Sequence, residues 1–159
     1  MVSKMRPAAF QKYKRIHERF GLPKLTELKA TFKLNLEDDE VTFDEIRTEI
    51  SDKLFMMTEK IVEPIIAGYD SFSGMYEQGM LTEKEVASLF RLYKKIQVLK
   101  WENTLLMLKH DEKETAEWIK NVWGFWNGEF KPELTNVSKK LSASWKNLEF
   151  KEKKTDYHG

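Results

Sequence analysis

Three helix-capping signals, each at the start of a stretch of helix-spaced apolar residues, constrain the fold more than any other feature. Thr42, Thr82 and Asp111 each stand three residues before a glutamate. In this arrangement the capping side chain and the glutamate satisfy free backbone N–H groups at a helix N-terminus. The sequence therefore predicts an all-α fold. We expect an antiparallel helical bundle of four to five main helices plus a short N-terminal helix, in a single domain over residues 1–159.

Composition limits the classes of protein to consider. A hydrophobic content of 41% supports a core, and a charged content of 33% supports a solvated exterior. The absence of cysteine excludes disulfides, thiolate metal sites and cysteine nucleophiles. A net charge of +1 favours neither nucleic acid nor a membrane as a partner. No apolar run is long enough to span a bilayer and no secretory signal is evident, so we expect a cytoplasmic protein.

Apolar spacings of three and four residues place the individual helices. They predict helices over 7–20, from Pro23, after Thr42, over 83–109, after Asp111 and from Pro132. We expect a kink or an end at Pro64. Residues 68–81 contain three glycines and predict an ordered connecting loop, with at most one helical turn. Asn127-Gly128 is expected to end the helix that starts after Asp111, and the polar tail from Lys151 is expected to fray.

The expected helix over residues 83–109 has the broadest apolar arc. Its members are Val86, Leu89, Phe90, Tyr93, Ile96, Leu99, Trp101 and Met107. A helix that is apolar around most of its circumference is typical of a buried position. The arc therefore predicts that this is the most central helix of the bundle.

Three carboxylates are the sharpest enzymatic candidates. Glu45, Glu49 and Asp52 follow one another at spacings of four and three, as do the magnesium ligands of all-α nucleotide pyrophosphohydrolases. At about 100° per residue, however, they fall opposite the apolar stripe of their own helix. We therefore expect a solvated face, no metal and no cofactor, and retain a magnesium-dependent pyrophosphohydrolase-like enzyme as the alternative.

Basic residues gather towards both ends of the chain. Lys12, Arg15 and Arg19 lie in the first twenty residues, and seven lysines lie in residues 131–154. If the two terminal helices lie side by side, they form a basic patch able to contact phosphates. The near-zero net charge argues against nucleic-acid binding, which remains the second alternative, and favours mutual neutralisation of acidic and basic faces.

Four large aromatic residues within nine positions form the strongest interaction candidate. They are Trp118, Trp123, Phe125 and Trp126. Together they span close to half of the helix circumference, which is more than one core-facing stripe needs. We predict a partner-binding surface at Trp118, Phe125 and Trp126, because tryptophan is enriched at interface hot spots. The alternative is a helix that is buried on two sides.

Four segments of the chain resemble parts of small all-helical archaeal proteins that have no assigned function. The segments are 20–28, 43–47, 89–95 and 114–120. The resemblance implies an intracellular archaeal origin and the same helical layout. It supplies no catalytic residue.

These observations favour a non-enzymatic interaction or scaffold module. We expect such a module to form a homo-oligomer or to bind a protein partner through apolar surface that its own core leaves uncovered.

Overall fold

The computed structural model describes residue 13 and residues 17–36, 41–68 and 71–149. In this part of the chain every regular element is helical, which confirms the all-α fold class. The α-helices are α2 (Leu25–Phe32), α3 (Phe43–Met57), α4 (Glu63–Ala67), α5 (Phe72–Met80), α6 (Glu83–Lys109), α7 (Glu112–Phe125) and α8 (Lys131–Lys146). Two π-helical turns, η2 (Thr58–Val62) and η3 (Trp126–Phe130), join α3 to α4 and α7 to α8.

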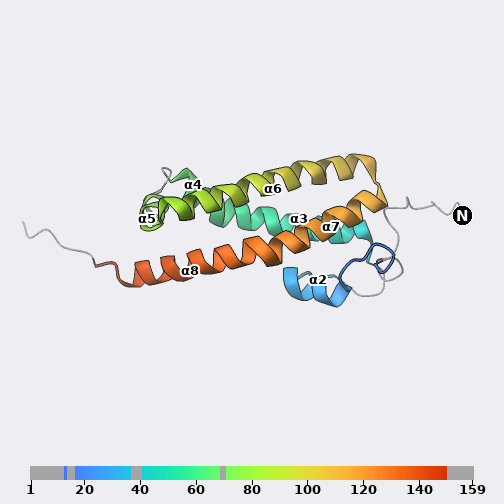
Figure 1. The fold of residues 1–159 in the computed structure, drawn as a ribbon, viewed down its shortest axis with the longest axis horizontal. Coiled ribbons are helices and arrows are strands. Elements are labelled where there is room, and N and C mark those ends of the chain that lie inside the picture. Colours follow the sequence, from blue (N-terminus) through green and yellow to red (C-terminus); the bar gives the residue numbers. More distant parts are fainter. Residues whose placement is uncertain (1–12, 14–16, 37–40, 69–70, 150–159) are drawn as a thin grey trace, which may run out of the picture.

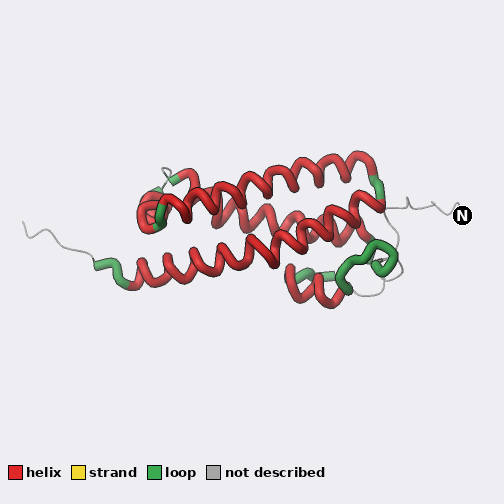
Figure 2. The backbone as a smooth tube through the Cα atoms, viewed as in Figure 1, coloured by secondary structure: helices red, strands yellow, loops and turns green. Residues whose placement is uncertain are grey.

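The helices form three long rods, the second of which runs antiparallel to the other two (Figure 1). The first rod comprises α3, η2 and α4, and α6 returns beside it along the upper edge of the view. The third rod, formed by α7, η3 and α8, runs back in the direction of the first. Short α5 lies at the end of the molecule where α4 meets α6, and short α2 lies beside the third rod (Figures 1 and 2).

Side-chain caps start the three main helices where the sequence predicts. The hydroxyls of Thr42 and Thr82 accept hydrogen bonds from the N–H groups of Glu45 and Glu85, and both glutamates return the bond to the capping residue. Asp111 accepts from the N–H of Glu114 at 2.8 Å, and no return bond is seen. The predicted starts of α3, α6 and α7 are therefore confirmed.

One apolar core runs between the three rods. Its fully buried side chains include Phe43, Ile46, Ile50, Leu54, Leu89, Ile96, Ile119, Val122 and Phe130. Most of these come from α3, α6 and α7, which are amphipathic with helical periodicity. The periodicity in the sequence therefore locates the core-facing side of each of these rods.

Helix α5 has nine residues and fills most of the segment for which the sequence predicts a loop with at most one helical turn, so the prediction of a loop is wrong. The Ser71 hydroxyl caps the helix by accepting from the N–H of Gly74 at 3.0 Å. A Cβ at Gly74 would lie 3.0 Å from the carbonyl oxygen of Pro64, so glycine allows α5 to approach α4 closely. The Gln78 amide then donates to the carbonyls of Ile65 and Ile66 at the end of α4.

Each π-helical turn stands just before a proline. Turn η2 ends two residues before Pro64, and η3 ends two residues before Pro132. In η2 the N–H of Glu63 bonds to the carbonyl of Thr58, five residues back, and η3 has the equivalent bond. Proline lacks an N–H and its ring crowds the carbonyl four residues back, so a wider turn lets the helix continue.

These turns account for two further outcomes. The first rod ends at Ala67 with Gly68 in the left-handed region (φ 68°), which confirms the expected end near Pro64. The expected end at Asn127-Gly128 is wrong, because the chain passes through η3 into α8 while Trp126 and Phe130 stay in the core.

The predicted helix over residues 7–20 lies largely outside the described residues, as do Lys12, Arg15 and the tail from Lys151. In the part that is described, the N–H of Leu22 bonds to the carbonyl of His17, and Gly21 is left-handed with φ 65°. Gly21 therefore has the left-handed conformation that is typical of a helix C-terminal cap.

Candidate functional site

The face of α6 that points away from the core is apolar over its C-terminal half. Its side chains are Val98, Trp101, Leu105 and Leu108, which are 53%, 65%, 52% and 75% exposed. Their spacing of three, four and three residues is that of a coiled-coil seam. We call these four residues the outer seam.

A second seam on the same helix faces the core. It consists of Leu89, Leu92, Ile96, Leu99, Asn103 and Leu106, all of which are buried. Each outer-seam residue follows an inner one by two positions, for example Val98 after Ile96 and Trp101 after Leu99. Two positions correspond to a rotation of about 200°, so the two seams lie on nearly opposite sides of α6.

Among the described residues, side chains pack over the inner seam and leave each outer-seam residue more than half exposed. The prediction that α6 is the most central helix is therefore wrong, since Trp101, Phe90 and Met107 from its predicted apolar arc are all more than half exposed. The outer seam exposes on the order of 500 Å² of apolar surface, within the range of the largest patch on a typical monomer. Contiguous patches of this size often mark an interaction site.

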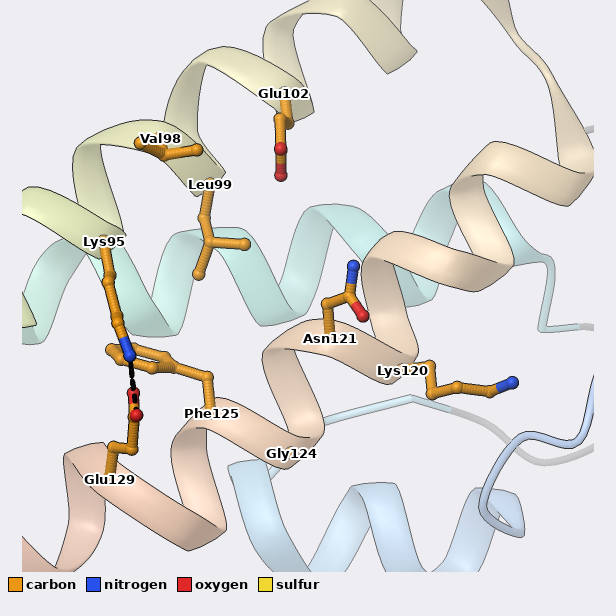
Figure 3. Close-up of a pocket in the computed structure, with 9 residues that line it drawn as sticks. All are labelled: Lys95, Val98, Leu99, Glu102, Lys120, Asn121, Gly124, Phe125 and Glu129. Carbon is orange, nitrogen blue, oxygen red and sulfur yellow. Dashed lines mark hydrogen bonds and ion pairs between the residues drawn. The ribbon is translucent and has the colours of Figure 1, made fainter.

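A groove of about 570 Å³ runs between α6 and α7 beside the outer seam (Figure 3). Val98 belongs both to the seam and to the groove, and Phe125 lies half-buried on the α7 side. Lys95 reaches across to the Glu129 carboxylate at 2.6 Å and bridges the groove at one end. This exposed ion pair joins two rods at the surface and adds little to stability.

A second groove of about 520 Å³ continues along the same two helices towards the α6–α7 turn. Leu105 of the outer seam forms part of its wall. Its charged residues are four acids and two lysines: Glu102, Asp111, Glu114, Glu117, Lys109 and Lys113. The surface beside the C-terminal half of the seam is therefore acidic on balance.

The structure buries two of the three predicted partner-binding aromatics. Trp118 is 3% exposed and its indole N–H donates to the carbonyl of Leu99 at 3.0 Å. Trp126 is 9% exposed and packs against Phe32, with ring centroids 5.0 Å apart. The prediction that these two indoles face a partner is wrong, because α7 is buried on two sides as the alternative proposed. Phe125 is half-buried and lines the groove between α6 and α7.

Glu45, Glu49 and Asp52 do not converge on a common point. Glu45 is exposed and engaged in the cap of α3, where its carboxylate accepts from the N–H of Thr42 at 2.9 Å. Asp52 is exposed and Glu49 partly so, which agrees with the expected solvated face. Within the described ranges, no three acidic or histidine side chains are grouped so that they could hold a metal ion.

Of the predicted nucleic-acid residues, only Arg19 lies in the described part. It is exposed and stacks over the Phe20 ring at 5.3 Å. Burial raises the pKa of Glu112 above its ordinary range, and the positive charge of Arg19 opposes that effect. Arg19 therefore lies near the start of α7, at the opposite end of the molecule from the end of α8 (Figure 1). The described basic segments do not form one patch.

The outer seam was missed because its residues carry the same signal as core residues. The residues of α6 contain two sets of heptad-spaced apolar positions, and one set is shifted by two positions from the other. This pattern could have revealed the outer seam, since a bundle of this size covers one seam of a helix more readily than two. No helix among those described combines the length and the apolar character that crossing a membrane requires. Comparison with known proteins found no matching family, curated protein or solved structure.

Proposed function

We propose that this chain is a non-enzymatic helical interaction module that binds a helix of a protein partner along the outer seam of α6. The observation that carries the proposal is the exposure of a complete heptad-spaced stripe, opposite the face that builds the core. A partner that covered this stripe would gain roughly 25 cal/mol of free energy for each Å² of apolar area removed from water.

The arrangement of the stripe suits a helix-in-groove contact. Trp101 stands near the middle of the outer seam, between Val98 and Leu105, where a buried aromatic anchor contributes most to affinity. The grooves on the α7 side supply a polar rim with charges of both signs. We also propose a cytoplasmic location, which the absence of cysteine supports.

A double variant tests the proposed surface. Trp101→Ala with Leu105→Lys alters exposed side chains only, so the fold should persist and circular dichroism should be unchanged. The matched control is Phe72→Ala with Met75→Lys on α5, whose side chains are 75% and 61% exposed. Native mass spectrometry of each protein, purified gently from its own cells, reports what stays bound.

We expect wild type and the α5 control to carry a partner chain or a further copy, and the seam variant to lose it. An assembly that survives the seam substitutions, or a wild-type protein that is always a bare 18.9 kDa chain, would overturn the proposal.

A further inference from the structure

We infer that the partner is a second copy of this chain, paired antiparallel across the two outer seams. The inference rests on the proposed function, because it identifies the occupant of the same surface. Three properties of the surface carry it: the register of the seam, the distribution of charge along it, and its area.

The seam is self-complementary when two copies run in opposite directions. About a twofold axis at the level of Asn103, Val98 faces Leu108 of the other copy and Trp101 faces Leu105 of the other copy. Each small side chain then meets a larger one, and each pair occurs twice, as twofold symmetry requires. The buried face of α6 stays inside its own bundle in this arrangement.

Charge changes sign along the surface. Beside the N-terminal half of α6 stand Arg91, Lys94 and Lys95, of which Lys95 is paired with Glu129, and the helix itself has no acidic residue from position 86 to 101. Beside the C-terminal half lies the groove described above, whose four acids outnumber its two lysines, and Lys109 lies 3.8 Å from the carboxylate of Glu114.

Antiparallel pairing therefore sets unlike charges together. It brings Lys94 of one copy to the Asp111 end of the other, and the exchange is mutual. Parallel pairing would set the basic halves against each other, which is unfavourable. The match between two halves of one surface favours a second copy over an unrelated helix.

The area also fits a dimer of ordinary size. A standard interface buries about 800 Å² on each partner, of which roughly two thirds is apolar in homodimers. The outer seam alone exposes on the order of 500 Å² of apolar surface, and the charged rim beside it supplies the polar remainder.

Because the chain has no cysteine, single introduced cysteines report the pairing directly. Val98→Cys and Leu108→Cys are made separately, and one of the two carries a mass tag. In the antiparallel dimer the two positions meet across the interface, so mild oxidation of the mixture yields the mixed disulfide. Each variant alone should give none, because like positions lie about 15 Å apart along the axis, beyond disulfide reach.

Sedimentation of the wild-type chain accompanies the cross-linking, with Trp101→Glu/Leu105→Glu as the interface variant and Phe72→Glu/Met75→Glu as its control. We expect twice the chain mass for wild type and control, and a single chain for the interface variant. A disulfide between two Val98→Cys chains would overturn the antiparallel register. A monomeric wild type would overturn self-pairing; the proposed function would survive that result only if the seam variant still lost a different protein from cells.

Discussion

Arg47 is a buried charge of this bundle, with a side chain that is 5% exposed. Its guanidinium donates to the Asp44 carboxylate at 2.7 Å and to the side-chain oxygen of Asn103 on α6. Its Nε is buried without a hydrogen-bond partner in the described part of the chain. Asn103 is thus the one polar member of the inner seam, and its amide holds Arg47 against α6. Removing one partner of a buried charge costs more than replacing the whole group by apolar side chains.

Asn103→Leu should therefore lower the free energy of unfolding by about 2 kcal/mol, because it leaves the guanidinium further unpaired. The double variant Arg47→Met/Asn103→Leu should recover most of that loss, since no buried charge remains. Urea denaturation followed by circular dichroism measures both. A single variant as stable as wild type would show that Asn103 does not compensate the buried charge.

Tyr13 makes the stability of the folded chain depend on pH in the alkaline range. The side chain is 1% exposed and its hydroxyl donates to the carbonyl of Pro23. Burial first, and the negative charge of Glu27 second, raise the pKa of Tyr13 well above its ordinary value of 10. The folded state then keeps the proton at a pH where the unfolded chain loses it. The contribution of Tyr13 to the free energy of unfolding is therefore complete below pH 10 and is lost as the pH rises further.

We therefore expect the free energy of unfolding to fall above about pH 10, and to fall less steeply in Tyr13→Phe. Lysine titration affects wild type and Tyr13→Phe alike. The difference between their slopes of unfolding free energy against pH therefore reports the ionisation of the Tyr13 hydroxyl alone. Chemical denaturation at a series of pH values measures those slopes. Parallel slopes would mean that Tyr13 has the same proton affinity in the folded and unfolded chains.

At the scale of the element, the capping chemistry and the periodicity predict where the three rods start and which side faces the core. Helix α5 could not be predicted, because the role of Gly74 depends on a tertiary contact. Glycine at this position lets α5 lie close to the carbonyl of Pro64, and one sequence does not reveal that contact. The outer seam could not be separated from the core for a similar reason. Spacing shows that Trp101 lies on an apolar face, and it does not show whether the chain has another helix to cover that face.

The π-helical turns offer a prediction at the same scale. A π turn holds one more residue than an α turn, so deleting Gly128 should convert η3 to α-helix while the side chains of α8 keep their register. Pro132 would then crowd an α-helical carbonyl, at a cost of about 3 kcal/mol. Combining the deletion with Pro132→Ala should remove that cost and restore stability near wild type.

Thermal unfolding of the deletion, the combined variant and a control compares these effects. The control deletes Asn136 within α8, which rotates Val137 and Leu141 away from the core and should destabilise with or without Pro132→Ala. If the combined variant is no more stable than the deletion alone, Pro132 is not the reason for the π turn.

At the scale of the whole molecule, three rods leave more helix surface than one small core can cover. Helix α2 packs against the junction of α7 and η3, where Phe32 contacts Trp126, and α5 packs on the far end of α8, where the rings of Tyr76 and Trp145 lie 4.4 Å apart. Neither α2 nor α5 covers the outer seam, whose four side chains remain more than half exposed on the C-terminal half of α6. A second copy would cover it without any change to the fold.

Such pairing makes thermal stability depend on concentration, because a partner that binds only the folded chain stabilises it by mass action. Above the dissociation constant, a hundredfold rise in protein concentration should raise the midpoint of wild-type unfolding by about 4 °C for a chain of this length. Trp101→Glu/Leu105→Glu should show a constant midpoint, and Phe72→Glu/Met75→Glu should keep the wild-type dependence. Scanning calorimetry over that range measures all three. A midpoint that is independent of concentration in wild type, with reversible unfolding, would mean that the outer seam stays exposed in solution and that no second copy covers it.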